Sequence, residues 1–233
     1  RRLLKLKKKG FFSNADYEKL YPSGSKPARA YGLPKLHKKY VKVPKFRPIV
    51  STIGTYNSNL ASFLGDMVSE ITPRDYRSSD TFTFLKDLGS CNIDGKFMIS
   101  YDVTSLFTNI PLEETLDLAV RLILENNPNL KISHSELREL FVFCTSKTNF
   151  LFQGVIYDQV DGISMWSPLA PNLANLFMGY HEKIWLSEYG GQDPPTFYRR
   201  YVDDIFAVFD NRGEALSFLE YLNTRHPNIK FTK

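Results

Sequence analysis

The chain contains 233 residues, of which 42% are hydrophobic and 14% aromatic, with 30 Lys and Arg against 25 Asp and Glu. This composition excludes a disordered tail, a collagen-like fibre and a disulfide-stapled miniprotein, and it suits one or two packed lobes. No apolar run approaches the roughly 18–20 residues that span a bilayer, and no cleavable signal opens the sequence, so we expect an intracellular protein without membrane contact.

The cysteines and histidines form no metal-binding pattern. Cys91 and Cys144 have no CxxC spacing, and the four histidines are scattered singly along the chain. A structural zinc site therefore has no support in the sequence.

Positive charge is concentrated in the first fifth of the chain. Residues 1–50 carry 15 basic and 2 acidic side chains, a net charge of +13, which leaves −8 for residues 51–233. Between residues 26 and 47 the basic side chains alternate with aromatic ones. Because cations hold phosphates and aromatic rings stack on bases, this pattern predicts nucleic-acid binding, to which we assign Lys38, Lys39, Lys42 and Lys45. For residues 1–9 alone, a solvated basic face explains the charge equally well.

The predicted elements begin with extended segments. Pro and Gly divide residues 31–50 into short strands and turns, and a helical period of apolar residues follows over residues 59–71. Residues 97–101 form an apolar run suited to a buried strand that ends at Asp102. A helix then begins at Pro111 and stops at Asn126-Asn127-Pro128.

The second half alternates between helices and short strands. Ser133 and Glu136 predict a capping box for the next helix, and a hairpin is expected over residues 150–157. Another helix begins at Pro171. Two β-rich runs, residues 197–201 and 205–209, then flank an Asp-Asp pair, and a helix around residues 216–222 and a strand at 229–231 complete the pattern. This order predicts an α+β fold whose antiparallel sheet is of the split βαβ, RRM-like type, with helices on one face.

Three carboxylates stand at strand ends in this pattern. Asp203 and Asp204 lie in a tight turn between two hydrophobic strands, where like charges raise each other's pKa and resist folding unless a cation is present. Asp102 ends another strand. If these strands are neighbours, the three acids converge into an oxygen-rich site that suits two Mg²⁺ ions about 4 Å apart, the arrangement used for in-line phosphoryl displacement. The alternative for an isolated Asp-Asp is a solvent-facing hairpin turn.

Four motifs, in a family's order and approximate spacing, resemble those of reverse transcriptases. Residues 97–111 (FMISYDVTSLFTNIP) resemble the first palm motif, and Tyr201-Val202-Asp203-Asp204 resembles the Tyr-x-Asp-Asp motif. Residues 31–38 (YGLPKLHK) and 46–51 (FRPIVS) are similar to the fingers of Penelope-like retroelement enzymes, relatives of telomerase. The resemblance runs from about Gly10 to the end of the chain.

The resemblance implies a set of catalytic residues. Asp102 and Asp203 would ligate two Mg²⁺ ions, for which Mn²⁺ substitutes, with help from the Val103 carbonyl, and Asp204 would complete the acidic cluster. The expected reaction is addition of dNTPs to a DNA primer on an RNA template, as part of retrotransposon replication. A nuclear location follows from the same resemblance.

The resemblance also implies contacts to the nucleotide and to nucleic acid. Lys35 and Arg47 would grip the triphosphate, and Tyr201 would contact nucleic acid. Phe107 occupies the sugar-selecting position, where an aromatic ring excludes a 2′-hydroxyl; its alternative role is that of a core aromatic. The counterpart of motif B is Met165-Trp166-Ser167-Pro168-Leu169, with Trp where the family has Gly, so both Met165 and Trp166 would lie near the nucleotide.

The implied domains are a basic fingers region in residues 1–95, with further fingers elements from about 125–160, and a palm in residues 96–233, without a thumb. Two alternatives remain open. One is a catalytically impaired nucleic-acid-binding module, favoured by Trp166 and by the lack of a thumb. The other is a palm-type RNA polymerase, against which Phe107 argues.

Overall fold

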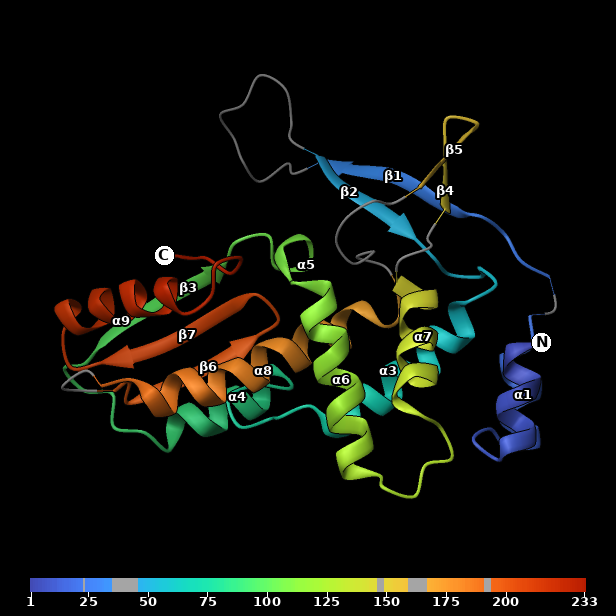
Figure 1. Cartoon of the computed structure of the whole chain (residues 1–233). Helices are drawn as coiled ribbons and strands as arrows, with labels where there is room; N and C mark the ends of the chain where they lie inside the picture. Colours follow the sequence, from blue (N-terminus) through green and yellow to red (C-terminus); the bar gives the residue numbers. More distant parts are fainter. Residues whose placement is uncertain (23, 35–45, 146–148, 159–166, 191–193) are drawn as a thin grey trace. The chain divides into compact units, whose positions relative to one another are not determined.

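The computed structural model describes residues 1–22, 24–34, 46–145, 149–158, 167–190 and 194–233. It has a mixed α+β fold, as predicted, and its residues form two compact units. The first unit comprises Arg1–Ile71 and Leu112–Leu173, and the second comprises Thr72–Pro111 and Ala174–Lys233 (Figure 1). None of the helices in the described ranges combines the length and apolar character that crossing a bilayer requires.

The helices of the first unit enclose an apolar core. They are α1 (Arg2–Lys9), α2 (Asn14–Leu20), α3 (Ser58–Ile71), α6 (Leu112–Asn126) and α7 (His134–Thr145). The predicted capping box at the start of α7 is confirmed: Glu136 N donates to Ser133 Oγ at 3.3 Å, and Ser133 N donates to Glu136 Oε2 at 3.1 Å. Contacts among α3, α6 and α7 bury Leu64, Leu116 and Phe141 completely.

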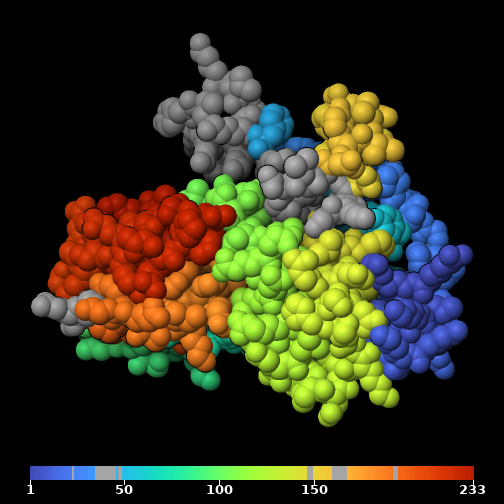
Figure 2. All heavy atoms as spheres, in the orientation of Figure 1, coloured from blue at the N-terminus to red at the C-terminus, as the bar shows by residue number. Residues whose placement is uncertain are grey.

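The first unit also contains a four-stranded sheet of order β2-β1-β4-β5. Its strands are β1 (Ala28–Pro34), β2 (Phe46–Ser51), β4 (Asn149–Phe152) and β5 (Val155–Asp158). β4 and β5 form the predicted hairpin, turning through Gln153 and Gly154, whose φ angles of 49° and 83° lie in the left-handed region. The hairpin, gold in Figure 2, exposes apolar side chains, among them Ile156 at 66%.

The sheet of the second unit has the strand order β6-β7-β3-β8, with antiparallel pairing throughout. The strands are β3 (Phe97–Val103), β6 (Phe197–Tyr201), β7 (Asp204–Phe209) and β8 (Phe231–Thr232). β3 therefore lies between β7 and β8, although both follow it by about 100 residues of sequence or more. The second sheet is therefore antiparallel, and its assignment to the split βαβ type stays a prediction.

Helices contact both faces of this sheet, which differs from the prediction of helices on one face. On one face, the Tyr101 hydroxyl donates to the Ala215 carbonyl in α9 (Arg212–Arg225), and Arg200 pairs with Glu182 in α8 (Ala170–Glu188). On the other face, α4 (Thr81–Gly89) brings Phe84 to 5.5 Å from the ring of Phe206. Helix α4 was not predicted from the sequence, although Asp80 caps its start and Phe84, Leu85 and Leu88 follow a helical spacing.

Each of the two units is built from two separate stretches of sequence. Residues 72–95 belong with the second sheet, because Arg200 N donates to Tyr76 O and Ser78 N donates to Arg200 O, each at 2.8 Å. Residues 112–173 belong with residues 1–71 in the first unit. The division of the chain into fingers and palm stays a prediction.

Candidate active site

The three predicted catalytic carboxylates lie at one end of the second sheet. The β3–β7 register pairs Asp102 directly with Asp204. The backbone N–H of Val103 donates to the carbonyl oxygen of Asp203 at 2.9 Å. The two strands are therefore neighbours, which is the condition on which convergence of the acids depends.

Asp203 belongs to a strained two-residue turn. Val202 and Asp203 connect β6 to β7, and Tyr201 pairs with Asp204 across the base of the turn. Val202 has a φ of 58°, in the left-handed region that β-branched residues rarely adopt and that such hairpins usually give to Gly. Backbone strain of this kind costs about 1–3 kcal/mol and persists only where surrounding contacts impose it. Outliers of this type cluster at functional sites.

The arrangement places like charges together at the surface. Asp102 and Asp204 are exposed and Asp203 is half-buried. Residues paired directly across strands have Cβ atoms about 4.5–5.5 Å apart, so ionised Asp102 and Asp204 repel each other. A bound divalent cation would offset this repulsion.

The chemistry of the oxygen donors fits Mg²⁺ or Mn²⁺. Carboxylate and carbonyl oxygens are the ligands that these hard cations prefer, and Asp102, Asp203 and the Val103 carbonyl supply them from adjacent backbone positions. In the part of the chain that the structure describes, no three Asp, Glu, His or Cys side chains are grouped so as to hold an ion. Two carboxylates and one backbone carbonyl are thus available to bind the ion. A third carboxylate, histidine or cysteine side chain is not grouped with them in the described residues.

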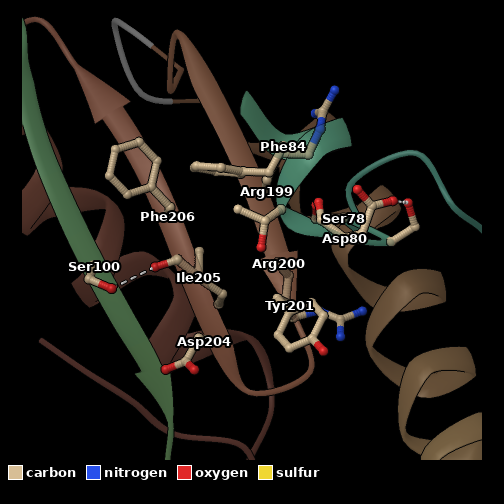
Figure 3. A pocket seen from close by; sticks show the side chains of 12 residues that line it. Ser78, Asp80, Phe84, Ser100, Arg199, Arg200, Tyr201, Asp204, Ile205 and Phe206 are labelled. Carbon is tan, nitrogen blue, oxygen red and sulfur yellow. Dashed lines mark hydrogen bonds between the residues drawn. The ribbon is translucent and has the colours of Figure 1, made fainter. Parts of the chain in front are cut away.

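A cavity of about 440 Å³ lies beside Asp204 on the sheet face that α4 contacts (Figure 3). Rings of Phe84, Phe206 and Tyr201 line it, together with several hydroxyl groups. The hydroxyl of Ser100 donates to the carbonyl of Ile205 at 3.2 Å. Tyr201, predicted to contact nucleic acid, is 58% exposed, so its ring is accessible next to the carboxylates.

Phe107 lies in the same unit as the carboxylates. It is half-buried in the one-turn helix α5 (Leu106–Asn109). The residue before α5, Ser105, has a left-handed φ of 49°, and the Asn109 side-chain amide donates to the Thr104 carbonyl at 2.9 Å. These features fix the backbone that presents Phe107 five residues after Asp102. Its predicted role in sugar selection stays a prediction.

Several other predicted ligands lie outside the described residues, namely Lys35, Lys38, Lys39, Lys42, Lys45, Met165 and Trp166. Of Arg47 the structure describes the backbone alone, in β2 opposite Leu33. Arg47 belongs to the first unit and the carboxylates to the second. The expected grip on a triphosphate therefore remains a sequence-based prediction.

Two charged residues behind the turn were not predicted from the sequence. Arg200 and Glu182 are 0% and 1% exposed and form an ion pair, with Arg200 Nε donating to Glu182 Oε1 at 2.7 Å. Strand alternation gave a signal that could have found Arg200, because it lies on the same face as the buried Tyr198. Helical spacing gave a comparable signal for Glu182, which lies four residues after the buried Met178 and three before the buried Trp185.

The fold is similar to that of nucleic-acid polymerases. An apo telomerase from Candida tropicalis, truncated from its C-terminal domain, matches with a TM-score of 0.53 and 13% identity over 86% of this chain and 47% of that one. The BmCPV RNA-dependent RNA polymerase at elongation state matches with a TM-score of 0.57 and 11% identity, over 95% and 21%. The Sicinivirus 3Dpol RNA-dependent RNA polymerase matches with a TM-score of 0.51 and 12% identity, over 94% and 48%.

This chain spans about half or less of the length of each of these proteins. No protein-family model matches the chain. No curated protein matches it by sequence either. At identities this low, the likeness concerns the fold alone.

Proposed function

We propose that this chain forms the fingers and palm of an RNA-directed DNA polymerase that adds dNTPs to the 3′-hydroxyl of a primer. The observation that carries the proposal is the direct pairing of Asp102 with Asp204 at the strand end, beside Asp203 in a strained turn. In a palm of this kind, the second unit supplies the carboxylates and the first unit supplies the fingers.

Different residues of the chain would bind the metal ions, the triphosphate and the nucleic acid. Mg²⁺ or Mn²⁺ held by Asp102, Asp203 and the Val103 carbonyl would neutralise charge that develops during in-line phosphoryl displacement. Lys35 and Arg47 would bind the triphosphate, for which the planar guanidinium fork of Arg is suited. Tyr201, exposed beside the carboxylates, would contact the nucleic acid at the site of addition.

The finer assignment, to Penelope-like retroelement reverse transcriptases, is supported by the fingers motifs of residues 31–38 and 46–51. Under this assignment the partners are an RNA template, a DNA primer and dNTPs, and the protein acts in the nucleus. The concentration of basic side chains in residues 1–50 supports binding to such polyanions.

Primer extension tests the proposal. The protein is incubated with a DNA primer annealed to an RNA template, dNTPs and Mg²⁺, and extended products are resolved by length. Asp102→Ala and Asp203→Ala should each abolish extension while RNA affinity, measured in parallel by fluorescence anisotropy, stays largely intact. Extension by either variant at a near wild-type rate would overturn the assignment of the carboxylates. RNA binding without any extension by the wild-type protein would favour the impaired binding module instead.

An RNA-dependent RNA polymerase is the second candidate, because viral RNA polymerases are among the structures of similar fold. Phe107 separates the two. If its ring excludes the 2′-hydroxyl, Phe107→Ala should raise NTP incorporation relative to dNTP by about tenfold or more, about 1.4 kcal/mol of discrimination. Wild-type protein that prefers NTPs in direct competition would favour the RNA polymerase.

A further inference from the structure

A buried arginine lies directly behind the turn that carries Asp203. Arg200, in β6, is fully buried, and its Nη1 donates to the carbonyl oxygen of Val202 at 2.8 Å and to Asn175 Oδ1 at 3.2 Å. The preceding residue, Arg199, points to the opposite face of the sheet, where it pairs with Asp87. Of these two adjacent arginines, Arg200 is the one whose guanidinium donates a hydrogen bond to the turn.

The contact meets the point of greatest backbone strain in the turn. Val202 holds an unfavourable left-handed φ of 58°. A hydrogen bond from a charged guanidinium is roughly twice as strong as one between neutral groups. The bond from Arg200 to the Val202 carbonyl therefore offsets part of the strain and fixes the orientation of the peptide that leads into Asp203.

Other groups fix the guanidinium in turn. Arg200 Nε donates to Glu182 Oε1 at 2.7 Å, and the Tyr198 hydroxyl donates to the same oxygen at 2.8 Å. The pKa of Tyr198 is raised, chiefly by burial and then by the neighbouring Glu182 carboxylate, so its hydroxyl remains a hydrogen-bond donor. The backbone of Arg200 is also held on both sides, by Tyr76 and Ser78. The guanidinium thus has one orientation.

Stability alone gives a poor account of this network. Burying an ion pair costs desolvation free energy, and replacing such a pair with well-packed apolar side chains is often neutral or stabilising. Within the described residues, Glu182 Oε2 and Arg200 Nη2 are buried and form no hydrogen bond, which adds to the cost. What an apolar pair cannot do is donate to the Val202 carbonyl.

We infer that Arg200, held by Glu182, is a positioning residue that sets the Val202–Asp203 turn for metal binding. The inference rests on the proposed function, in which Asp203 is a metal ligand. Arg200 does not touch the metal or the substrate; it acts through the peptide of Val202. Groups that orient a ligand in this way typically contribute about 10–100-fold to metal affinity or activity.

The test replaces the pair by side chains of similar length, Arg200→Met with Glu182→Met, in the full chain. The matched control is Arg225→Met with Glu188→Met, which removes another ion pair of the second unit away from the turn. Three quantities are compared with wild type: melting temperature, Mn²⁺ affinity from the electron paramagnetic resonance signal of free Mn²⁺, and kcat and KM for single dNTP addition.

The double variant at Arg200 and Glu182 should melt close to the wild-type temperature. Its Mn²⁺ affinity and kcat should fall by about tenfold or more, while KM for dNTP changes little. The control pair should leave Mn²⁺ affinity and kcat unchanged. A folded Arg200 and Glu182 variant with wild-type Mn²⁺ affinity and kcat would overturn the inference.

Arg200→Lys covers the case in which the double variant does not fold. The ammonium keeps a positive charge next to Glu182, but as a compact group it lacks the fork that reaches both Glu182 and the Val202 carbonyl. The same loss of Mn²⁺ affinity is expected, and wild-type affinity would contradict the inference.

Asp203→Ala separates this inference from the proposed function. Mn²⁺ binding that Asp203→Ala abolishes, but that the Arg200 variants leave intact, overturns the positioning role alone. Wild-type protein that binds no Mn²⁺ and adds no nucleotide overturns both.

Discussion

The hydroxyl of Tyr101 donates a hydrogen bond of 2.7 Å to the carbonyl oxygen of Ala215, and so ties β3 to α9 inside the second unit. Both residues are buried, and Tyr101 immediately precedes Asp102. Burial, followed by the nearby Tyr189, raises the pKa of Tyr101, which keeps the hydroxyl protonated as a donor. The strand that presents Asp102 on one face is therefore anchored on the other.

Tyr101→Phe should lower the free energy of unfolding by about 0.5–1.5 kcal/mol, because the carbonyl of Ala215, inside α9, loses the hydrogen bond that the Tyr101 hydroxyl donates to it. Nucleotide addition at 25 °C should remain close to wild type, since the ring still fills its site beneath Asp102. Urea denaturation measures the stability. Tyr157→Phe, at an exposed hairpin position, is the matched control and should cost at most about 0.5 kcal/mol. Equal losses in the two variants would contradict the anchoring role.

Asp204→Asn should raise the melting temperature, or leave it unchanged, when divalent cations are absent and ionic strength is low. The substitution removes one of two like charges that face each other across β3 and β7. Added Mg²⁺ should stabilise the wild-type protein more than the variant, because a ligand that binds the folded state stabilises it by mass action. Differential scanning fluorimetry with EDTA and with Mg²⁺ gives both values. A lower melting temperature for Asp204→Asn in EDTA would argue against repulsion at this site.

Acid should destabilise the first unit partly through Glu136. Its carboxylate accepts hydrogen bonds from Lys9 Nζ at 2.5 Å and from the backbone N–H of Ser133, and these bonds, Lys9 first, lower its pKa to about 2. Since the folded-state pKa lies below the unfolded one, this contribution is complete at neutral pH. It is lost as the pH falls from about 5 to about 2.

Glu136→Gln should therefore melt at a temperature that depends less on pH between 5 and 2 than the wild-type temperature does. Gln retains the geometry of a capping box, so the helix start is preserved. Melting temperatures at several pH values across this window test the prediction. Parallel curves for the two proteins would show that Glu136 titrates without consequence for folding.

RNA affinity should depend on the lysines at positions 38, 39, 42 and 45. Changing all four to Gln should weaken binding and reduce the slope of log K against log salt by about 0.7 for each phosphate that is no longer neutralised. Lys5→Gln with Lys9→Gln is the comparison. Both of those lysines are within ion-pair distance of Glu136, so their replacement should change the slope less. Anisotropy titrations across a range of salt concentrations measure the slopes, and an unchanged slope in the quadruple variant would remove these lysines from the interface.

Sequence patterns correctly predicted those helices and strands that depend on contacts between residues close together in the chain. The strand that ends near Asp102, the capping box of Ser133 and Glu136 and the hairpin around Gln153 all appear in the structure, because each depends on residues within a few positions of one another. Helix α2 was not predicted, although Ser13 and Asp16 form a capping box at its start. The reason is that the apolar residues after the capping box are too few to give a clear helical period.

These local patterns could not predict contacts between side chains on elements that are far apart in the sequence. Arg200 in β6 pairs with Glu182 in α8, 18 residues earlier in the chain. The position of α4 on the second face depends on a contact between Phe84 and Phe206, more than 100 residues apart. Periodicity within a helix or strand can mark a side chain as buried, but it does not identify its partner on another element. The sequence predicted that Asp102 and Asp204 lie together only if their two strands are neighbours, and it could not show that they are.

Trp166 stands where motifs of the resembled family have Gly. The residues that follow it are firmly packed: Ser167 is 4% exposed, Leu169 is fully buried, and Leu169 N donates to Ser167 Oγ at 3.4 Å. The described chain that begins at Ser167 is therefore held by buried contacts. Overpacking a closely packed site typically costs about 1–3 kcal/mol.

If the backbone of this loop lies beside the incoming nucleotide, as the resemblance implies, the indole competes with the nucleotide for space. Trp166→Gly should then raise kcat/KM for dNTP addition by about tenfold, equivalent to about 1.4 kcal/mol of transition-state stabilisation, chiefly through a lower KM. Trp166→Phe, which keeps an aromatic ring, should give a smaller gain. Steady-state kinetics of single-nucleotide addition measure both variants. If Trp166→Gly instead loses activity together with nucleic-acid affinity, the indole serves as a stacking surface for a base, a contribution worth about 1–3 kcal/mol at such sites.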